Sequence, residues 1–216
     1  QEWKDAARDL AQAFVNTWVK NKDLGNYVNA ATGEIIIYHS TSGAIAPAGL
    51  VLAARYFKEN SFLKTAMEIA GYFYDDYVVG LGFTCAHSGD IMQDADADSA
   101  YGFMESLMAL YYATMDKKWL SMAKTTAHLA ATWTLSYDYE YPPGSTLYDL
   151  KANTAGAIWA SVQNKHAAPG ICTSSGDYLF KLFRATGQVR YADLLRDIIH
   201  AHAEVMETPG RSTTGM

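Results

Sequence analysis

Acidic side chains that could do chemistry gather near the middle of the chain, in residues 93–118. This stretch reads QDADADSAYGFMESLMALYYATMDKK, so a run of alternating aspartates leads directly into an apolar helical pattern. Two carboxyl groups placed together can divide acid and base work between them. Asp94 and Asp96 stand in the loop before that helix, and Asp177 stands in the first turn of another predicted helix. These three aspartates are the candidate catalytic residues.

The same stretch allows two other interpretations. Four acidic residues fall at positions 1, 3, 5 and 12 of a calcium-binding EF-hand loop, namely Asp94, Asp96, Asp98 and Glu105. However, Ser99 stands where that loop needs glycine, and the helical period begins inside the supposed loop. Asp98 followed by Ser99 is also typical of a helix N-cap and predicts a helix that begins near Ser99. Solvated aspartates around a cap are therefore an alternative to a site.

Aromatic and polar side chains in the long loops suggest a ligand with hydroxyl groups. Aromatic residues surround the turn Pro142–Gly144, and rings beside carboxylates suit sugars, whose apolar faces lie on rings while their hydroxyls bind carboxylates. The run Ser161–His166 predicts the end of a short helix with free amide and imidazole groups. Packing under the loop and loop-stabilising hydrogen bonds are the alternatives. The predicted substrate-binding residues are His87, Asp138, Tyr139, Glu140, Trp159, Gln163, Asn164 and His166.

Two cysteines and two histidines could also bind zinc. Cys85, His87, His166 and Cys172 are zinc-competent ligands, but their spacing matches no compact zinc motif. Histidines that bind a sugar hydroxyl or a backbone carbonyl fit this spacing better. We therefore expect no metal site and no cofactor, and the sequence leaves the pairing of the two cysteines open.

The composition excludes several classes of protein. Half of the residues are apolar and 19% are charged, which is typical of an ordered chain with a core, here one domain over residues 1–216. The net charge of −6 is spread out without a Lys/Arg cluster, which argues against a nucleic-acid partner. No apolar run approaches the ~20 residues that cross a bilayer. The absence of a signal-like segment after Gln1 is consistent with a mature secreted form, so we expect a periplasmic or secreted protein.

The first part of the chain predicts helices and one short extended segment. Trp3, Leu10, Phe14 and Trp18 recur on one side of a predicted amphipathic helix over residues 2–20. The run from Glu34 to Tyr38 predicts a short extended segment inside a loop. Pro47, which the first turn of a helix tolerates, precedes an apolar helix that ends near Phe57.

One helix–turn–helix pattern occurs three times. Residues 54–66, 111–123 and 183–195 each contain the end of an apolar helix, a turn of about three residues and the start of an amphipathic helix. Phe62, Trp119 and Tyr191 are equivalent in the three copies. A helical hairpin that recurs cannot bury its apolar face alone, so neighbouring hairpins must stack.

The connections between the hairpins are much longer than the turns within them. They span about residues 80–98 and 136–173, and each leads into the N-terminal end of an apolar helix. The long loops should therefore gather on one face, and long loops in a compact domain usually carry function.

With these hairpins and loops, the sequence resembles the six-hairpin, (α/α)-barrel glycosidase-like superfamily over most of residues 43–206. The resemblance implies an all-α hairpin barrel, or toroid, with short turns on one face and substrate-binding loops on the other. About four of the six hairpins are present, so we expect an incomplete barrel or part of a longer protein. The segment Pro209–Met216 follows the last predicted helix without a closing element, which is consistent with that expectation.

The function that the resemblance implies is hydrolysis of a glycosidic bond by paired carboxylates in a cleft at the long-loop face. The partner would then be an oligosaccharide or a sugar derived from a polysaccharide. Because one fold supports many chemistries, two alternatives stay open. One is a glycan-binding or scaffold protein without catalysis. The other is a sugar epimerase, which would need paired histidines such as His87 and His166.

Overall fold

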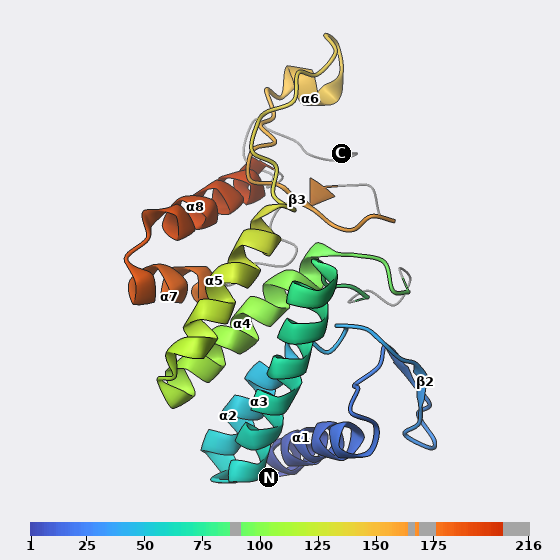
Figure 1. The fold of residues 1–216 in the computed structure, drawn as a ribbon. Coiled ribbons are helices and arrows are strands. Elements are labelled where there is room, and N and C mark those ends of the chain that lie inside the picture. Colours follow the sequence, from blue (N-terminus) through green and yellow to red (C-terminus); the bar gives the residue numbers. More distant parts are fainter. Residues whose placement is uncertain (87–91, 164–166, 169–175, 205–216) are drawn as a thin grey trace.

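The computed structural model describes residues 1–86, 92–163, 167–168 and 176–204 (Figure 1). Helices form most of the described chain, which confirms the expected all-α class. The helices are α1 (Glu2–Asn21), α2 (Ala46–Phe57), α3 (Asn60–Tyr72), α4 (Ala97–Thr114), α5 (Lys117–Ala131), α6 (Thr146–Asp149), α7 (Asp177–Thr186) and α8 (Val189–Glu204). No helix within these described ranges is long and apolar enough to cross a membrane.

The long helices stack as hairpins, as the repeat predicts. The pairs α2/α3, α4/α5 and α7/α8 are each joined by a short turn. The first helices of the pairs pack side by side, α2 against α4 and α4 against α7. Helix α1 packs against both α2 and α3 (Figure 1). The described residues therefore contain three hairpins, the long helix α1 beside them and the short helix α6, where the sequence suggested about four hairpins.

The three hairpin turns are alike residue by residue. Phe62, Trp119 and Tyr191 are each the third residue of their helix, with side chains 0%, 2% and 2% exposed. Each backbone N–H donates to the carbonyl oxygen three residues earlier, at 3.2–3.3 Å. The equivalence of these aromatic residues is confirmed, and each anchors the start of an outer helix in the core.

Each preceding helix ends on a residue in the left-handed conformation. Lys58, Met115 and Gly187 have φ angles of 57°, 56° and 69°, and each donates its N–H to the carbonyl oxygen four residues earlier. Glycine takes up this conformation without steric cost, whereas lysine and methionine do not. The three turns therefore share one backbone geometry, but only Gly187 is of a residue type that predicts it.

Helix α4 lies at the centre of the core. Buried side chains cover most of its circumference, including Tyr101, Phe103, Met104 and Leu107, and one stripe that contains Glu105 and Tyr112 is less covered. The buried sides pack against α2, α3, α5 and α7. The loop before α4 is therefore attached to the most enclosed helix of the hairpin stack.

Helix α1 differs from the predicted amphipathic helix. Trp18 is buried and donates its indole N–H to Glu68 Oε2 at 2.9 Å, whereas Trp3 is 88% exposed. Leu10, on the predicted apolar side, is also exposed. The sequence pattern identifies the helix correctly, but only its C-terminal part is covered by the core.

Helix α3 continues into a π-helix, η1 (Phe73–Leu81), which the sequence did not predict. Phe73, Tyr77 and Val78 are buried along this nine-residue segment, and it ends at Gly82, whose φ is 75°. The long loop to α4 begins there, close to the predicted residue 80.

Strands are few and short among the described residues. Strand β1 (Tyr27–Val28) pairs antiparallel with β2 (Ile35–Ile37), which confirms the extended segment predicted in the first loop. Strand β3 (Ile158–Trp159) pairs antiparallel with β4 (Ala167–Ala168) in the loop before α7. Both pairs belong to the long connections rather than to the hairpin stack.

Candidate functional site

The long loops are joined to one another by backbone hydrogen bonds beside the N-terminal end of α4. We call this set of segments, residues 39–42, 84–86, 93–97, 133–135 and 157–162, the loop platform. The amide of Asp96 donates to the Thr84 carbonyl at 3.1 Å, and the amide of Ala97 donates to the Ala160 carbonyl at 2.9 Å. The segment 93–97 is therefore held on one side by the start of its own loop and on the other side by the loop between α5 and α7, which is distant in the sequence.

Further bonds extend the loop platform in both directions. On one side, the Thr41 hydroxyl donates to the Cys85 carbonyl at 2.9 Å and accepts the Cys85 amide at 2.7 Å. On the other side, the amide of Trp159 donates to the Trp133 carbonyl at 2.7 Å. The expected gathering of the long loops on one face is thus present in these described segments.

Asp96 lies at the centre of the loop platform and caps α4. Its side chain is 1% exposed, and Oδ1 accepts the backbone N–H of Ser99 at 2.7 Å. Helix α4 consequently begins at Ala97, and the predicted cap formed by Asp98 with a helix start near Ser99 is wrong. The cause is the extended backbone of Asp96, which is fixed by its pairing with Thr84 and puts the cap two residues earlier.

The EF-hand interpretation is contradicted by the same helix. Asp98 and Glu105 both belong to α4, so the backbone cannot form the loop in which those oxygens would converge. Across the described parts of the chain, no group of three or more His, Cys, Asp or Glu side chains is arranged to hold a metal ion.

Asp94 is placed quite differently from Asp96, although both were predicted to be catalytic. Its side chain is exposed, and its backbone carbonyl accepts the amide of Ala86 at 3.1 Å. With the residues that the structure describes, its carboxylate forms no hydrogen bond or ion pair. Asp94 therefore offers an available carboxylate at the surface of the loop platform.

Asp177, the third predicted catalytic residue, is the first residue of α7. It is exposed and forms an ion pair with Lys181, one turn later on the same helix. Such pairs are ordinary features of a helix surface. Within the described residues Asp177 shares no hydrogen bond or ion pair with Asp94 or Asp96, so its catalytic role stays a prediction.

The predicted sugar-binding loop forms an arm that projects from the hairpins and carries α6 near its tip (Figure 1). At its base, Asp138 Oδ1 accepts the amides of Thr154 and Ala155 at 2.8 and 2.9 Å. The amide of Tyr139 donates to the Thr154 hydroxyl at 2.9 Å. Asp138 thus closes the arm by hydrogen bonds, while Glu140 is exposed.

Two tyrosine rings stand at the surface of this arm. The ring centroids of Tyr137 and Tyr139 are 5.4 Å apart, and both rings are exposed. Partial desolvation, with a smaller effect from Tyr137, raises the pKa of the Tyr139 hydroxyl. The pair can offer apolar ring faces and hydroxyl donors to a ligand.

The remaining predicted binding residues are divided between described and undescribed parts of the chain. Trp159 is half-buried in β3, and Gln163 is exposed. Residues 161–163 form no helix, so the predicted short helix at Ser161 is wrong. The reason is that Ser161 pairs with Asp96 in an extended backbone bridge. His87, Asn164 and His166 lie outside the described residues.

Cys85 is a packed thiol within the loop platform. Burial raises the pKa of the Cys85 thiol, although hydrogen bonds from Thr41 partly oppose this effect. A buried thiol of raised pKa is a poor nucleophile and a poor metal ligand. The other three residues of the zinc interpretation, His87, His166 and Cys172, lie outside the described residues.

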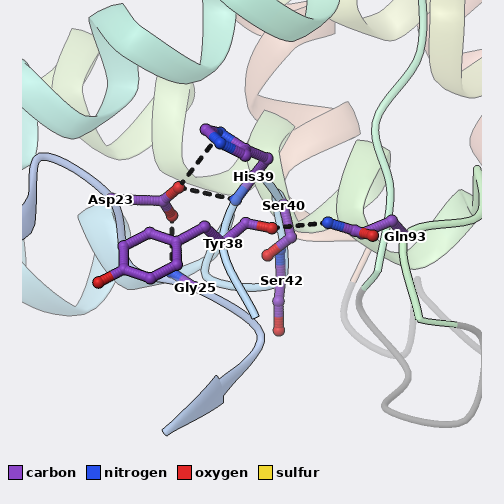
Figure 2. Close-up of polar contacts among 7 residues, drawn as sticks. All are labelled: Asp23, Gly25, Tyr38, His39, Ser40, Ser42 and Gln93. Carbon is purple, nitrogen blue, oxygen red and sulfur yellow. Dashed lines mark hydrogen bonds and ion pairs between the residues drawn. The ribbon is translucent and has the colours of Figure 1, made fainter. Parts of the chain in front are cut away.

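Sequence reasoning missed a buried aspartate and an exposed histidine in the first loop (Figure 2). Asp23 is 3% exposed and accepts the amides of Gly25 and His39 at 2.7 and 2.8 Å. The His39 ring points toward this carboxylate, with Nδ1 3.8 Å from Oδ2. The sequence Asp-Leu-Gly at 23–25 is a turn signal, but nothing in it indicates that His39 is the partner.

A side chain of the central segment reaches the loop that carries His39. Gln93 Nε2 donates to the Tyr38 carbonyl at 2.7 Å (Figure 2). In addition, Asn26 Nδ2 donates to the Met92 carbonyl at 3.1 Å. Tyr38 and Gln93, the neighbours of His39 and Asp94 in the sequence, are therefore joined by a hydrogen bond. The side chains of His39 and Asp94 belong to adjacent loops that are connected in this way.

Two pockets are found away from these residues. An apolar groove of about 1280 Å³ runs along α1 and α2 and is lined by Trp3, Leu10, Leu52 and Tyr56, among others. A smaller one of about 630 Å³ lies near the α2/α3 turn. Neither is lined by a predicted site residue, so the substrate cleft at the long-loop face stays a prediction.

The fold and the loop platform together define an all-α protein of stacked helical hairpins with its long loops joined on one face. No protein-family model matches the sequence, and no curated protein matches it. Among solved structures, the chain is similar to a GH76 alpha-mannanase of Bacteroides thetaiotaomicron, with a TM-score of 0.49 and 18% identity. The similarity covers 78% of this chain and 44% of that chain, so this chain spans less than half of its length. A likeness of this level transfers no residue role to the chain.

Proposed function

We propose that this chain belongs to a carbohydrate-active enzyme that hydrolyses a glycosidic bond at the loop platform. The observation that carries the proposal is the position of residues 94–96. Asp94 is exposed with an available carboxylate, and the segment is held on one side by the start of its own loop and on the other by the loop before α7. Catalytic side chains need such support, since small displacements cost much of the rate.

The two carboxylates occupy different environments. The Asp94 side chain is exposed, whereas Asp96 is 1% exposed and accepts the amide of Ser99. Glycosidases divide the work between a protonated and an ionised carboxyl group, and the separation of the two groups sets the stereochemical outcome. The proposal pairs an exposed carboxylate with an enclosed one, and the stereochemistry of the product reports their separation.

The proposed substrate class follows from the exposed groups at the base of the arm. The exposed rings of Tyr137 and Tyr139 can carry the apolar faces of sugar rings, and Glu140 can accept hydroxyl hydrogen bonds. We propose an oligosaccharide, or a polysaccharide-derived sugar, as the ligand. A periplasmic or secreted location, where such substrates are found, is part of this proposal.

The proposal is tested with three matched substitutions of aspartate by asparagine. The substrates are oligosaccharides of glucose, mannose, xylose, galactose and arabinose in α and β linkages, with product release measured by chromatography. We expect Asp94→Asn and Asp96→Asn each to lower kcat by at least about 100-fold, the usual contribution of an acid–base group. Asp177→Asn is the control and should leave kcat unchanged, because Asp177 pairs with Lys181 on the surface of α7 and with no other residue that the structure describes.

The asparagine at position 96 makes the test specific for charge. Asparagine caps helices about as well as aspartate, so Asp96→Asn keeps the start of α4 while it removes the ionisable group. If the wild-type chain cleaves a substrate and both variants retain its activity, the carboxylate assignment is wrong. If no member of the panel is cleaved, hydrolysis by this chain is rejected.

A second candidate is a glycan-binding protein without catalysis. It is favoured by the structural partners of three loop carboxylates: Asp96 caps α4, Asp138 closes the arm and Asp177 pairs with Lys181. This candidate predicts binding of an oligosaccharide without cleavage, and equal affinity for wild type and Asp94→Asn. Isothermal titration with the same panel separates the two candidates.

A further inference from the structure

The backbone of His39, at the edge of the loop platform, has a conformation that costs stability. Its φ angle is 61°, in the left-handed region that is uncommon for residues other than glycine, although histidine adopts it more often than most. Lys22, Lys58 and Met115 share this conformation but close helices, where it is common. His39 closes no helix, so its conformation needs another explanation.

Left-handed residues other than glycine gather in this region. Ala86 and Met92, at φ angles of 68° and 54°, stand in the loop that leads to Asp94. Residues held in such conformations cluster at functional sites, where surrounding contacts maintain them against a cost in stability. The buried carboxylate of Asp23, which accepts the backbone N–H of His39 at 2.8 Å, is the contact that maintains His39.

The imidazole itself is almost fully available to a ligand. The side chain of His39 is 83% exposed, whereas that of Asp23 is 5% exposed. The Nδ1 side of the ring faces Asp23 Oδ2 at 3.8 Å (Figure 2). This separation is longer than a hydrogen bond, but the negative charge on that side favours Nδ1 as the protonated nitrogen of the neutral ring, and Nε2 is then a hydrogen-bond acceptor.

We propose that His39 is a substrate-contacting residue of the loop platform, and that Asp23 is its positioning residue. His39 Nε2 accepts a hydrogen bond from a sugar hydroxyl, and it lies on the loop that Gln93 bonds to the segment of Asp94. This inference rests on the proposed carbohydrate function and adds a second binding group beside the carboxylates.

The left-handed conformation allows a test that separates binding from stability. His39→Gly removes the ring and the steric cost but keeps the backbone N–H that Asp23 accepts. We expect the thermal midpoint to stay equal to wild type or to rise by roughly 2–4 °C. Affinity for the oligosaccharide that the wild type binds should fall about tenfold, the effect of one lost hydrogen bond.

Two further variants serve as controls. His39→Asn has a side chain that tolerates the left-handed conformation, so it should be as stable as wild type and also bind weakly. His200→Ala removes an exposed histidine on α8 and should change neither property. If His39→Gly binds normally, or unfolds at a clearly lower temperature, the histidine is structural and the inference is wrong.

The role of Asp23 has its own readout. At mildly alkaline pH, where an ordinary histidine is neutral, the imidazole ¹⁵N chemical shifts should show the proton on Nδ1 of His39. A dominant Nε2–H form would overturn the positioning role. A change in the ¹⁵N chemical shift of His39 Nε2 on addition of the oligosaccharide, with no change at His200, would support the contact between His39 and the sugar.

The outcomes distinguish this inference from the proposed function. If Asp94→Asn abolishes cleavage while His39→Gly binds and cleaves normally, the proposed function stands and the inference fails. If His39→Gly loses binding while Asp94→Asn cleaves normally, the inference stands and the carboxylate assignment fails. If the wild type binds no member of the oligosaccharide panel, both are rejected.

Discussion

At the scale of single residues, Asp96 stabilises the start of α4, and this structural role can be measured apart from any catalysis. Asp96→Ala should lower the free energy of unfolding by about 1–2 kcal/mol, because α4 loses its cap and the amide of Ser99 loses its partner. Asp96→Asn should lower it by less than about 0.5 kcal/mol. Urea unfolding followed by circular dichroism measures both.

A matched cap on another helix provides the control for this prediction. Asp116 caps α5 by accepting the amide of Lys118 at 2.9 Å, but it is exposed, so water can replace it. Asp116→Ala should therefore cost only about 0.5–1 kcal/mol. An equal loss for the two alanine variants would mean that burial of Asp96 adds nothing to the cap.

Sequence reasoning found the right stretch but not the right contacts. The alternation of aspartates before an apolar helix correctly placed Asp94 and Asp96 in the loop that enters α4. Which aspartate caps the helix depends on pairing with Thr84 at the start of the same loop and with Ser161, which is distant in the sequence. The Asp23–His39 pair was missed for the same reason, since a left-handed histidine has no sequence signal.

At the scale of elements, the equivalent aromatic residues predict how firmly each hairpin is anchored. Trp119 is fully enclosed, so Trp119→Ala should cost about 3–5 kcal/mol. Its indole N–H has no hydrogen-bond partner in the described structure, so Trp119→Phe should cost much less. Trp3→Ala is the control, and it should change stability by less than about 0.5 kcal/mol.

Thermal and denaturant unfolding of these three variants provide the measurement. A small loss for Trp119→Ala would contradict the view that the third residue of each outer helix anchors its hairpin. The sequence predicted these elements well, because the repeat fixes helix, turn and aromatic position together. It did not predict η1, since a π-helix has no distinct residue pattern and results from how α3 packs near its end.

At the scale of the whole molecule, the sequence predicted the hairpin architecture and the gathering of long loops on one face. It did not predict that Trp3 and Leu10 would line an open groove. Helical periodicity identifies an apolar side but not whether another element covers it. The expected cleft depends on how side chains from several loops converge, and that arrangement is also absent from any periodic pattern.

The loop platform has a consequence for the order in which the chain folds. The hairpin turns join neighbouring residues, whereas Thr41 and Cys85 are 44 positions apart. Contacts between distant residues form late, because closing a long loop costs entropy before any contact repays it. In pulsed hydrogen exchange, amide protection should therefore appear at Trp119 in α5 before it appears at Cys85 and Asp96. Simultaneous protection would contradict this order. If the order holds, the chain acquires its candidate site only after the hairpin stack has formed.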